Sequence, residues 1–445
     1  GRLAYLTMVM EIAGVVVIGG AEAAAFVVEI LVEAHAARTV LAGAAGAAIP
    51  QLEAARALGV LGAPESAQLL ADTAWARLAA FDVSGASADA AGAEEWARGA
   101  GHGPVLSSAL SVRSRLAAYD ADFDRAVELG RGAVSALAEP VAVRWTPELY
   151  LGLALSNAGQ PDEAFAVLAE GRRRAERAGA PWAIARFHAA HVLCGFHAGA
   201  WDDALAEAEA CRKLYAESDT RASYVQTEAL LGLIQFHRGE HESAREALRR
   251  ASDDFHTPGA DAGGAPWMLW LEAAFAEADG DLTAAGAALG AAFDLAVQLA
   301  VHSVKLWYGP ELARLAHRSG DDRRAAATAD ELAAVATRTP SPVAAAAAAR
   351  AGGIVTGDAE LLLTSVEHYR ATSRPLDLAW ALESAAGATS ATGDQSGAAQ
   401  LLDEALTVVE DLGAVHDARR LRATLRELGI NRGVRGPRQR ATTGL

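Results

Sequence analysis

The sequence predicts an all-α chain in which helical hairpins stack into a superhelix. Alanine, the strongest helix former, dominates the 445 residues, whereas Val, Ile and Thr are sparse after about residue 50. No run of alternating apolar residues is bounded by hairpin turns, so little or no β-sheet is expected. A short turn motif recurs at a nearly constant interval, which is typical of repeat proteins. Because each repeat contacts mainly its neighbours, one continuous body can extend over this length.

The repeating unit is clearest over residues 148–174. Gly152 stands on a first helix, residues 159–163 (GQPDE) form a turn, and Ala164 stands on a second helix. Gly159 tolerates the positive φ that commonly ends a helix. Gly152 has no side chain, so the returning helix can approach it closely. The spacing predicts a helical hairpin and resembles a tetratricopeptide unit.

The same turn recurs along the chain. Its copies begin at positions 121, 159, 199, 239, 280, 320, 357 and 393, so successive steps are 38, 40, 40, 41, 40, 37 and 36 residues. The copy at Ala121 is the weakest. This period exceeds the tetratricopeptide length of about 34 residues, so each helix should be longer by about half a turn to a turn. We therefore expect a tetratricopeptide-like α-solenoid of hairpins of about 40 residues over residues 61–430.

Residues 1–60 fit the repeat least well. Segment 14–20 (GVVVIGG) superficially suggests a phosphate-binding loop, but it lacks the Lys-Ser/Thr pair that would contact phosphate and Mg²⁺. Residues 12–28 are apolar apart from Glu22, yet they are too few and too rich in Gly and Ala to predict a membrane span. Two interpretations stay open for residues 1–60: helices that cap the array, or the remnant of a preceding domain.

Helix boundaries can be read over most of the array. Residues 61–140 are interpreted as two degenerate hairpins. Pro342, preceded by Ser341, marks a helix start because Ser is a favoured N-cap and Pro fits the first turn. The final helices are expected at residues 376–391, 397–412 and 414–428.

The charge distribution makes the chain as a whole a poor candidate for nucleic-acid binding. The net charge is −17, whereas residues 419–445 carry eight Arg against one Glu, or +7, which leaves −24 for residues 1–418. The basic tail either touches DNA phosphates beside a further domain or is only a charged linker. Cys194 and Cys211 provide no disulfide framework, which suits a reducing cytoplasm, and a cytoplasmic location is expected.

A series of short segments marks the C-terminal part of the chain. These are DEAL, EDLGA, ARRLR, LGINRGVRGPR and TTGL, at residues 403–406, 410–414, 418–422, 428–438 and 442–445, together with WYGPEL at residues 307–312. The series resembles large LuxR-type regulators of actinobacteria, in which this segment stands directly before a helix-turn-helix domain. The resemblance covers most of the chain from about residue 100.

The resemblance implies an architecture with three parts: a STAND-type ATPase module, a tetratricopeptide sensor and a C-terminal DNA-binding domain. MalT-like members bind an inducer sugar in the sensor. This sequence has neither a nucleotide-binding loop nor a helix-turn-helix motif. It therefore matches the sensor, with residues 431–445 as an Arg-rich linker toward a missing DNA-binding domain. No cofactor is expected in this chain, ATP would belong to the missing ATPase domain, and DNA would be contacted only through the missing C-terminal domain.

The first helix of each hairpin should line the concave wall of the superhelix. Aromatic side chains interleaved with Arg, Gln and His on that wall could hold a small organic ligand by stacking, cation–π contacts and hydrogen bonds. The candidate ligand-binding residues are Arg186, Phe196, His197, Gln226, Phe236, His237, Trp267, Trp270, Glu277, Arg314 and His317.

Two alternatives apply to this wall. The aromatic residues could simply fill the seams between hairpins, and the histidines could cap helix ends. Trp307 is not assigned to the wall, because a helix that starts at Pro310 would leave it in the preceding loop.

Catalysis is not expected. His188, His191 and Cys194 share one helix at three-residue spacing, but they lack a fourth ligand and suit packing equally well. No Ser, His and Asp spacing resembles a nucleophile motif.

The sequence thus predicts a ligand-sensing module of a LuxR-type regulator that binds a small-molecule effector, or a regulatory protein, in its groove. The alternative is an interaction scaffold whose groove binds a peptide or a partner helix. An enclosed, aromatic-lined cavity would favour the small molecule, and an open acidic channel would favour the peptide. No membrane association is expected, and an oligomer is compatible with the sequence.

Overall fold

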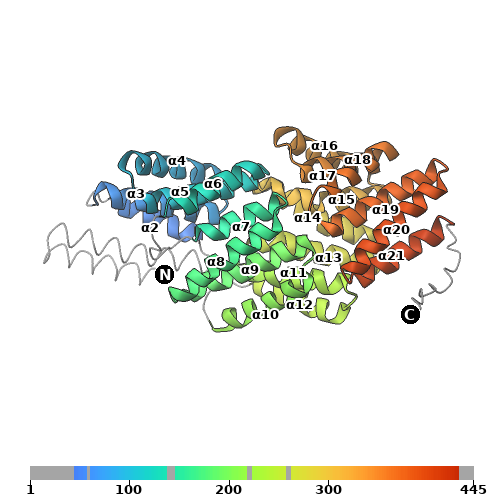
Figure 1. Cartoon of the computed structure of the whole chain (residues 1–445), viewed down its shortest axis with the longest axis horizontal. Helices are drawn as coiled ribbons and strands as arrows, with labels where there is room; N and C mark the ends of the chain where they lie inside the picture. Colours follow the sequence, from blue (N-terminus) through green and yellow to red (C-terminus); the bar gives the residue numbers. More distant parts are fainter. Residues whose placement is uncertain (1–44, 58–60, 138–145, 218–222, 257–261, 430–445) are drawn as a thin grey trace, which may run out of the picture.

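The computed structural model describes residues 45–57, 61–137, 146–217, 223–256 and 262–429, and within these ranges it contains helices and turns but no strand. The chain is an all-α, tetratricopeptide-like superhelix that forms an elongated body (Figure 1). The segments at residues 12–28, 14–20 and 431–445 lie outside the described residues.

Hairpins follow one another from α3 to α20, with α2 before them and α21 after them. Helix α2 spans Ala45–Ala57 and packs on α3 through Leu52 and Leu69. The helices are α3 (Ala63–Ala79), α4 (Val83–Ala100), α5 (Gly103–Tyr119), α6 (Phe123–Ser135), α7 (Pro147–Asn157), α8 (Pro161–Arg177), α9 (Pro181–Ala198), α10 (Trp201–Glu217), α11 (Tyr224–His237), α12 (His241–Phe255), the 3-10 turn η1 (Ala262–Gly264), α13 (Ala265–Ala278), α14 (Leu282–Gln298), α15 (His302–Ser319), α16 (Asp322–Arg338), α17 (Pro342–Thr356), α18 (Ala359–Arg370), α19 (Pro375–Ala391), α20 (Gln395–Asp411) and α21 (Val415–Glu427).

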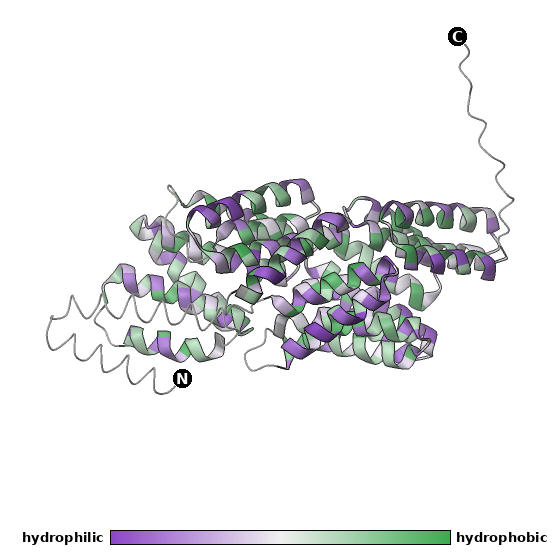
Figure 2. Ribbon diagram, turned by 90° about the horizontal axis from the view of Figure 1, so that it is seen from below, coloured by the Kyte–Doolittle hydropathy of each residue, from purple (hydrophilic) through white to green (hydrophobic). Residues whose placement is uncertain are grey.

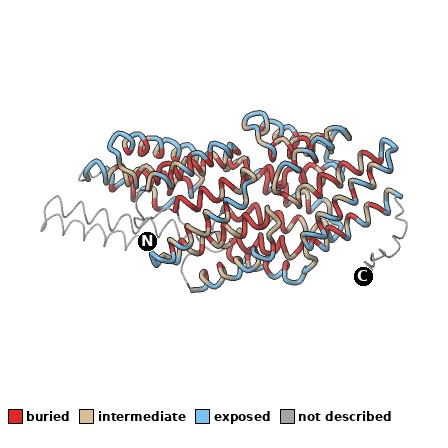
Figure 3. Tube along the Cα trace, viewed as in Figure 1, coloured by how far each residue is buried: buried red, intermediate tan, exposed pale blue. Residues whose placement is uncertain are grey.

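The two helices of a hairpin occupy different layers. Helix α11 (YVQTEALLGLIQFH) is apolar on nearly every side, and eleven of its fourteen residues are buried. Its partner α12 (HESAREALRRASDDF) is charged and buries Ala244, Ala247, Ala251 and Asp254, a stripe at helical spacing. First helices therefore form an inner layer and second helices an outer one. Figure 2 shows hydrophilic and hydrophobic residues sharing the same helices, and Figure 3 shows exposed residues gathered at the outer edges.

The turns between helices have the predicted geometry. The turn glycines at positions 159, 199, 239, 280, 320, 357 and 393 all have positive φ, between 68° and 94°. Several second helices begin after an Asp whose side chain accepts the N–H of the third residue along, as Asp281 does from Ala284 at 2.9 Å. The predicted close approach at Gly152 is also confirmed, since a Cβ there would lie 2.5 Å from Leu168 Cγ.

The predicted helix start at Pro310 is wrong. Pro310 lies inside α15, and Trp307 is a buried residue of the same helix rather than part of a loop. A proline inside a helix costs about 3 kcal/mol. Continuing the helix also buries Tyr308 and Leu312, and this packing offsets the cost.

The superhelix closes on itself after five hairpins. Helix α5 lies against α15, α9 against α19 and α11 against α21. Polar contacts cross the same seam, including Thr339 Oγ1 to the Asp120 carbonyl at 3.2 Å and Ser373 Oγ to the Gly159 carbonyl at 3.3 Å. The interior along these helices is therefore narrow, and it is not the open groove that the repeat pattern alone predicts.

Within the described residues, no helix combines the length and the apolar character needed to cross a membrane.

Candidate ligand-binding cavity

An aromatic cluster fills the interior beside the seam. Trp267 of α13 stacks on Trp307 of α15 with 4.8 Å between ring centroids. Phe196 of α9 packs edge-on against Trp270 at 5.8 Å. All four rings are buried, so they join three hairpins into one core.

A buried Arg–His contact connects this cluster to the opposite side of the superhelix. Arg374 Nη1 lies 2.9 Å from His197 Nδ1, although the two residues are 177 positions apart. Burial and the neighbouring guanidinium hold the pKa of His197 well below its usual range. His197 is therefore neutral at neutral pH and accepts this hydrogen bond at Nδ1.

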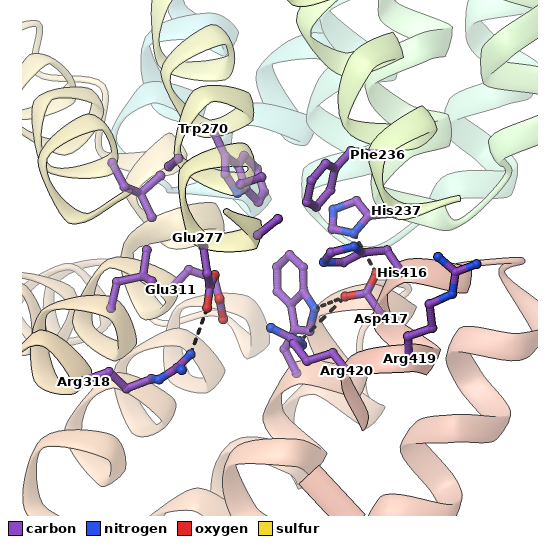
Figure 4. A pocket seen from close by; sticks show the side chains of 16 residues that line it. Phe236, His237, Trp270, Glu277, Glu311, Arg318, His416, Asp417, Arg419 and Arg420 are labelled. Carbon is purple, nitrogen blue, oxygen red and sulfur yellow. Dashed lines mark hydrogen bonds and ion pairs between the residues drawn. The ribbon is translucent and has the colours of Figure 1, made fainter. Parts of the chain in front are cut away.

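A cavity of about 380 Å³ lies next to the aromatic cluster, bordered by α11, α13, α14, α15, α19 and α21 and partly open to the surface (Figure 4). It is lined by Phe236, His237, Trp270, Ala273, Ala274, Glu277, Ala278, Leu289, Glu311, Leu315, Arg318, Trp380, His416, Asp417, Arg419 and Arg420. Two parts of the chain that are five hairpins apart meet in this lining, so its shape depends on the closure of the superhelix.

One side of the cavity is aromatic. The rings of Phe236 and His416 are 4.4 Å apart, and those of Trp270 and Trp380 are 6.3 Å apart. Burial lowers the pKa of His416 to about 4, so its imidazole is uncharged at neutral pH. This side can stack on a flat, apolar ligand.

The other side carries two carboxylates that are already paired. Both oxygens of Glu277 accept from Arg314 at 2.7 Å, and Oε1 also accepts from Arg318 at 2.9 Å. Glu311 accepts from Arg314 at 2.8 Å and from Arg350. Burial alone would raise the pKa of Glu311, but the two guanidinium groups outweigh it and hold this pKa well below its usual range. Both carboxylates are thus ionised and have their charge neutralised.

Asp417 joins α21 to α11 and α19. Its Oδ2 lies 2.7 Å from His237 Nδ1, and its Oδ1 accepts from Trp380 Nε1 at 3.0 Å. Burial opposes ionisation, but His237 and Arg420 outweigh it and lower the pKa of Asp417. The ionised carboxylate fixes the Nδ1–H tautomer of His237. His237 Nε2 has no hydrogen-bond partner among the described residues.

Four of the eleven residues predicted from the sequence line the cavity: Phe236, His237, Trp270 and Glu277. Arg314 is not a lining residue, but it donates to both oxygens of Glu277, which is one. Three more, Phe196, His197 and Trp267, belong to the adjacent aromatic cluster and do not line the cavity. The remaining three stand apart from it: Arg186 bonds to Tyr150, Gln226 is partly buried near the start of α11, and His317 is exposed beside Asp322.

The sequence prediction did not include the lining residues of α19 and α21. Trp380, His416, Asp417 and Arg420 reach the cavity only because the superhelix closes after five hairpins. Nothing in the repeat pattern indicates how many hairpins make one superhelical turn. The sequence pattern instead places the C-terminal arginines in the basic tail.

The histidine series on α9 has structural partners. His188 Nδ1 contacts Glu207, and His191 Nδ1 bonds to the Phe187 carbonyl at 2.9 Å. Cys194 is fully buried. No group of three or more residues suited to a metal ion gathers in the part of the chain that the structure describes.

Acidification is expected to destabilise the fold through buried histidines. Burial lowers the pKa of both His302 and His416 from the ordinary value of 6.5 to about 4. Between these values the unfolded chain binds more protons than the folded chain, so the free energy of unfolding falls as the pH falls. Asp377 has the opposite effect, because burial raises its pKa from 3.8 to about 6. Between these values the folded chain binds more protons at this position, so the free energy of unfolding rises as the pH falls.

The histidine contribution can be isolated by comparing His416→Phe with the unsubstituted chain. Urea unfolding at about pH 7 and about pH 5 should show a smaller loss of stability for the variant, because it has no proton to take up at this position. The control variant His317→Phe carries its substitution at an exposed position. Between about pH 7 and about pH 5 its free energy of unfolding should fall by as much as that of the unsubstituted chain. Equal losses in all three proteins would contradict the assignment.

Comparisons with solved structures place the fold among tetratricopeptide-repeat solenoids. A Rap protein complexed with competence and sporulation factor superposes with a TM-score of 0.52 at 13% identity, over 78% of this chain and 98% of the Rap chain. The APC/C hetero-tetramer Cut9-Hcn1 has a TM-score of 0.35 at 13% identity, covering 96% of this chain and 94% of that chain. The human IFIT1 dimer with m7Gppp-AAAA has a TM-score of 0.37 at 12% identity, covering 86% of this chain and 95% of that chain. No protein-family model and no curated protein matches the sequence.

Proposed function

We propose that this chain is the ligand-sensing module of a LuxR-type transcriptional regulator and that it binds a small-molecule effector in the cavity between α11, α13, α15, α19 and α21. The observation that carries the proposal is the partly open, aromatic-lined cavity of about 380 Å³. Pockets for small molecules typically measure about 300–1,000 Å³ and combine apolar walls with a few placed polar groups. The C-terminal sequence segments support the regulator family, and DNA would be contacted through a domain outside this sequence.

The position of the cavity supports a sensing role. A ligand there touches α11 and α13 on one side and α19 and α21 on the other. It would favour the curvature in which both sides contact it, and so shift the population of superhelical shapes. Such a shift would change how a domain attached beyond α21 is presented.

A peptide or partner helix fits this interior less well than a small molecule. Contacts such as Arg374 with His197 and Asp417 with His237 cross the space that an extended peptide would occupy. The likeness to the Rap protein complex is a likeness of fold and does not decide between these ligands. The cavity-filling experiment below distinguishes peptide binding from small-molecule binding.

The proposal is tested by filling the cavity. We expect a thermal-shift screen of metabolites to find compounds that raise Tm, because a ligand bound only to the folded state stabilises it by mass action. Ala274→Phe places a ring in the cavity and should weaken such a compound about tenfold or more in calorimetric titration. Ala287→Phe, at an exposed position of α14, is the matched control and should bind normally.

Two results would contradict the proposal. One is a set of metabolite hits whose affinities are the same in Ala274→Phe and Ala287→Phe. The other is a chain that binds only peptides, with affinities that Ala274→Phe leaves unchanged.

A further inference from the structure

We infer that the ligand of this cavity is a small organic anion with a flat, apolar body and a carboxylate or similar oxyanion group. The inference rests on the proposed function and specifies the chemistry of the effector. It follows from the hydrogen-bonding groups in the lining that are left without partners.

The carboxylates of the lining are already paired with donors of the protein. Glu277 holds Arg314 and Arg318, and Glu311 holds Arg314 and Arg350. Asp417 uses one oxygen for His237 and the other for Trp380. A ligand ammonium group would have to compete with these contacts, which are charge-assisted and strong.

Donors of the lining, in contrast, remain free. Arg420 Nη2 lies 2.8 Å from Glu383, but its buried Nε has no hydrogen-bond partner among the described residues. Arg419 lines the cavity and forms no ion pair within the described part of the chain. A buried donor without a partner costs about 1–3 kcal/mol, so an acceptor-rich group is the favourable occupant.

His237 adds a further polar atom at the same place. Its side chain is 6% exposed, it lines the cavity, and its Nδ1 is held by Asp417. Nε2 is therefore the atom available to a ligand, and in the Nδ1–H tautomer it accepts a hydrogen bond, for example from a hydroxyl group beside the ligand's anionic group. Figure 4 shows His237 of α11 close to Asp417 and Arg420 of α21.

The charge balance around the cavity agrees with these contacts. Five arginines line it or pair with a lining residue, namely those at positions 314, 318, 350, 419 and 420, against four carboxylates at positions 277, 311, 383 and 417. The surroundings are thus positive by one charge, whereas the whole chain carries −17. In a chain of such negative charge, a positive interior favours an anion over a cation.

The aromatic side determines the rest of the ligand. Phe236, Trp270 and Trp380 present ring surfaces, and His416 is uncharged at neutral pH. A planar body of one or two rings can stack there while its anionic group reaches Arg419 and Arg420.

The test uses one ring system with three charges: 2-naphthoate, the neutral 2-naphthamide and the cationic 2-naphthylmethylammonium. Calorimetric titration of the full chain should show that 2-naphthoate binds about tenfold tighter than the amide, because charge-assisted hydrogen bonds are the stronger ones. The cation should bind most weakly. The affinity of 2-naphthoate should also fall as salt is added.

Substitutions on α21 locate the anionic group. Arg419→Gln and Arg420→Gln should each reduce the preference for 2-naphthoate over 2-naphthamide. Arg419 stands at an exposed position. Arg422→Gln is the matched control, since Arg422 stands on the same helix but pairs with Glu410 away from the cavity. Circular dichroism confirms that each variant is folded.

The outcomes separate this inference from the proposed function. If the amide or the cation binds as tightly as 2-naphthoate, or if 2-naphthoate does not bind, the assignment of an anion is wrong. The metabolite screen and its Ala274→Phe variant then decide the proposed function independently.

Discussion

Replacing Glu311 with alanine is expected to lower the free energy of unfolding by about 3–5 kcal/mol. The Glu311 carboxylate accepts from Arg314 and Arg350, and the side chains of Glu311 and Arg350 are only 7% and 2% exposed. Without the carboxylate, Arg314 keeps Glu277, whereas among the described residues Arg350 keeps one hydrogen bond, to the Ser384 hydroxyl at 3.2 Å, and its contact with the Trp380 ring at 6.0 Å. The substitution therefore leaves a buried guanidinium without its counter-ion. Urea unfolding followed by tryptophan fluorescence measures the loss.

Two controls show whether the uncompensated charge causes this loss. The double variant Glu311→Leu with Arg350→Met removes both charges and should be more stable than Glu311→Ala. Glu404→Ala breaks the exposed pair with Arg370 and should cost at most about 1 kcal/mol. A Glu311→Ala loss no larger than that of Glu404→Ala would contradict the argument.

Gly199→Ala is expected to destabilise the chain by about 2–5 kcal/mol. Gly199 has φ +76°, a conformation that costs a residue with a Cβ about 1–2 kcal/mol. The new Cβ would also lie 2.5 Å from Leu412 Cδ2 and 2.9 Å from Pro375 Cγ. Leu412 can rotate away, but the Pro375 ring is rigid, so overpacking adds about 1–3 kcal/mol. Thermal unfolding measures the change.

Gly280→Ala separates the two contributions. Gly280 has a similar φ of +86°, but a Cβ there would meet nothing within 4 Å. Gly280→Ala should therefore destabilise the chain only by the cost of placing a residue with a Cβ at positive φ, about 1–2 kcal/mol. The difference in unfolding free energy between the two variants measures how much the contact of Gly199 with Pro375 and Leu412 contributes to stability. Equal losses of stability would mean that this contact contributes nothing.

The sequence could predict the local features of this fold because local residues determine them. Gly159 and its equivalents end helices through their own backbone conformation, and Gly152 with Leu168 sets the distance between the helices of one hairpin. The inner position of Phe236 and Trp270 likewise follows from helical spacing. The error at Pro310 arose where packing across hairpins outweighed a local preference.

The cavity could be predicted only in part. Its residues on α11 and α13 belong to the repeat pattern, whereas Trp380 and Asp417 arrive from the next superhelical turn. The number of hairpins in a turn depends on a small rotation at each interface, which accumulates from side-chain packing and has no signature in one sequence. For the same reason, the sequence could not show that Phe196 and Trp267 pack against each other rather than face a groove.

The meeting of helices five hairpins apart limits how this chain can change its length. In an open solenoid, one unit can be deleted or inserted and the remaining units simply restack. Here, removal of the hairpin α13–α14 would shift α21 relative to α11 and separate His237 from Asp417. The array has therefore lost the modularity of ordinary repeat proteins, and its hairpin number is fixed by geometry.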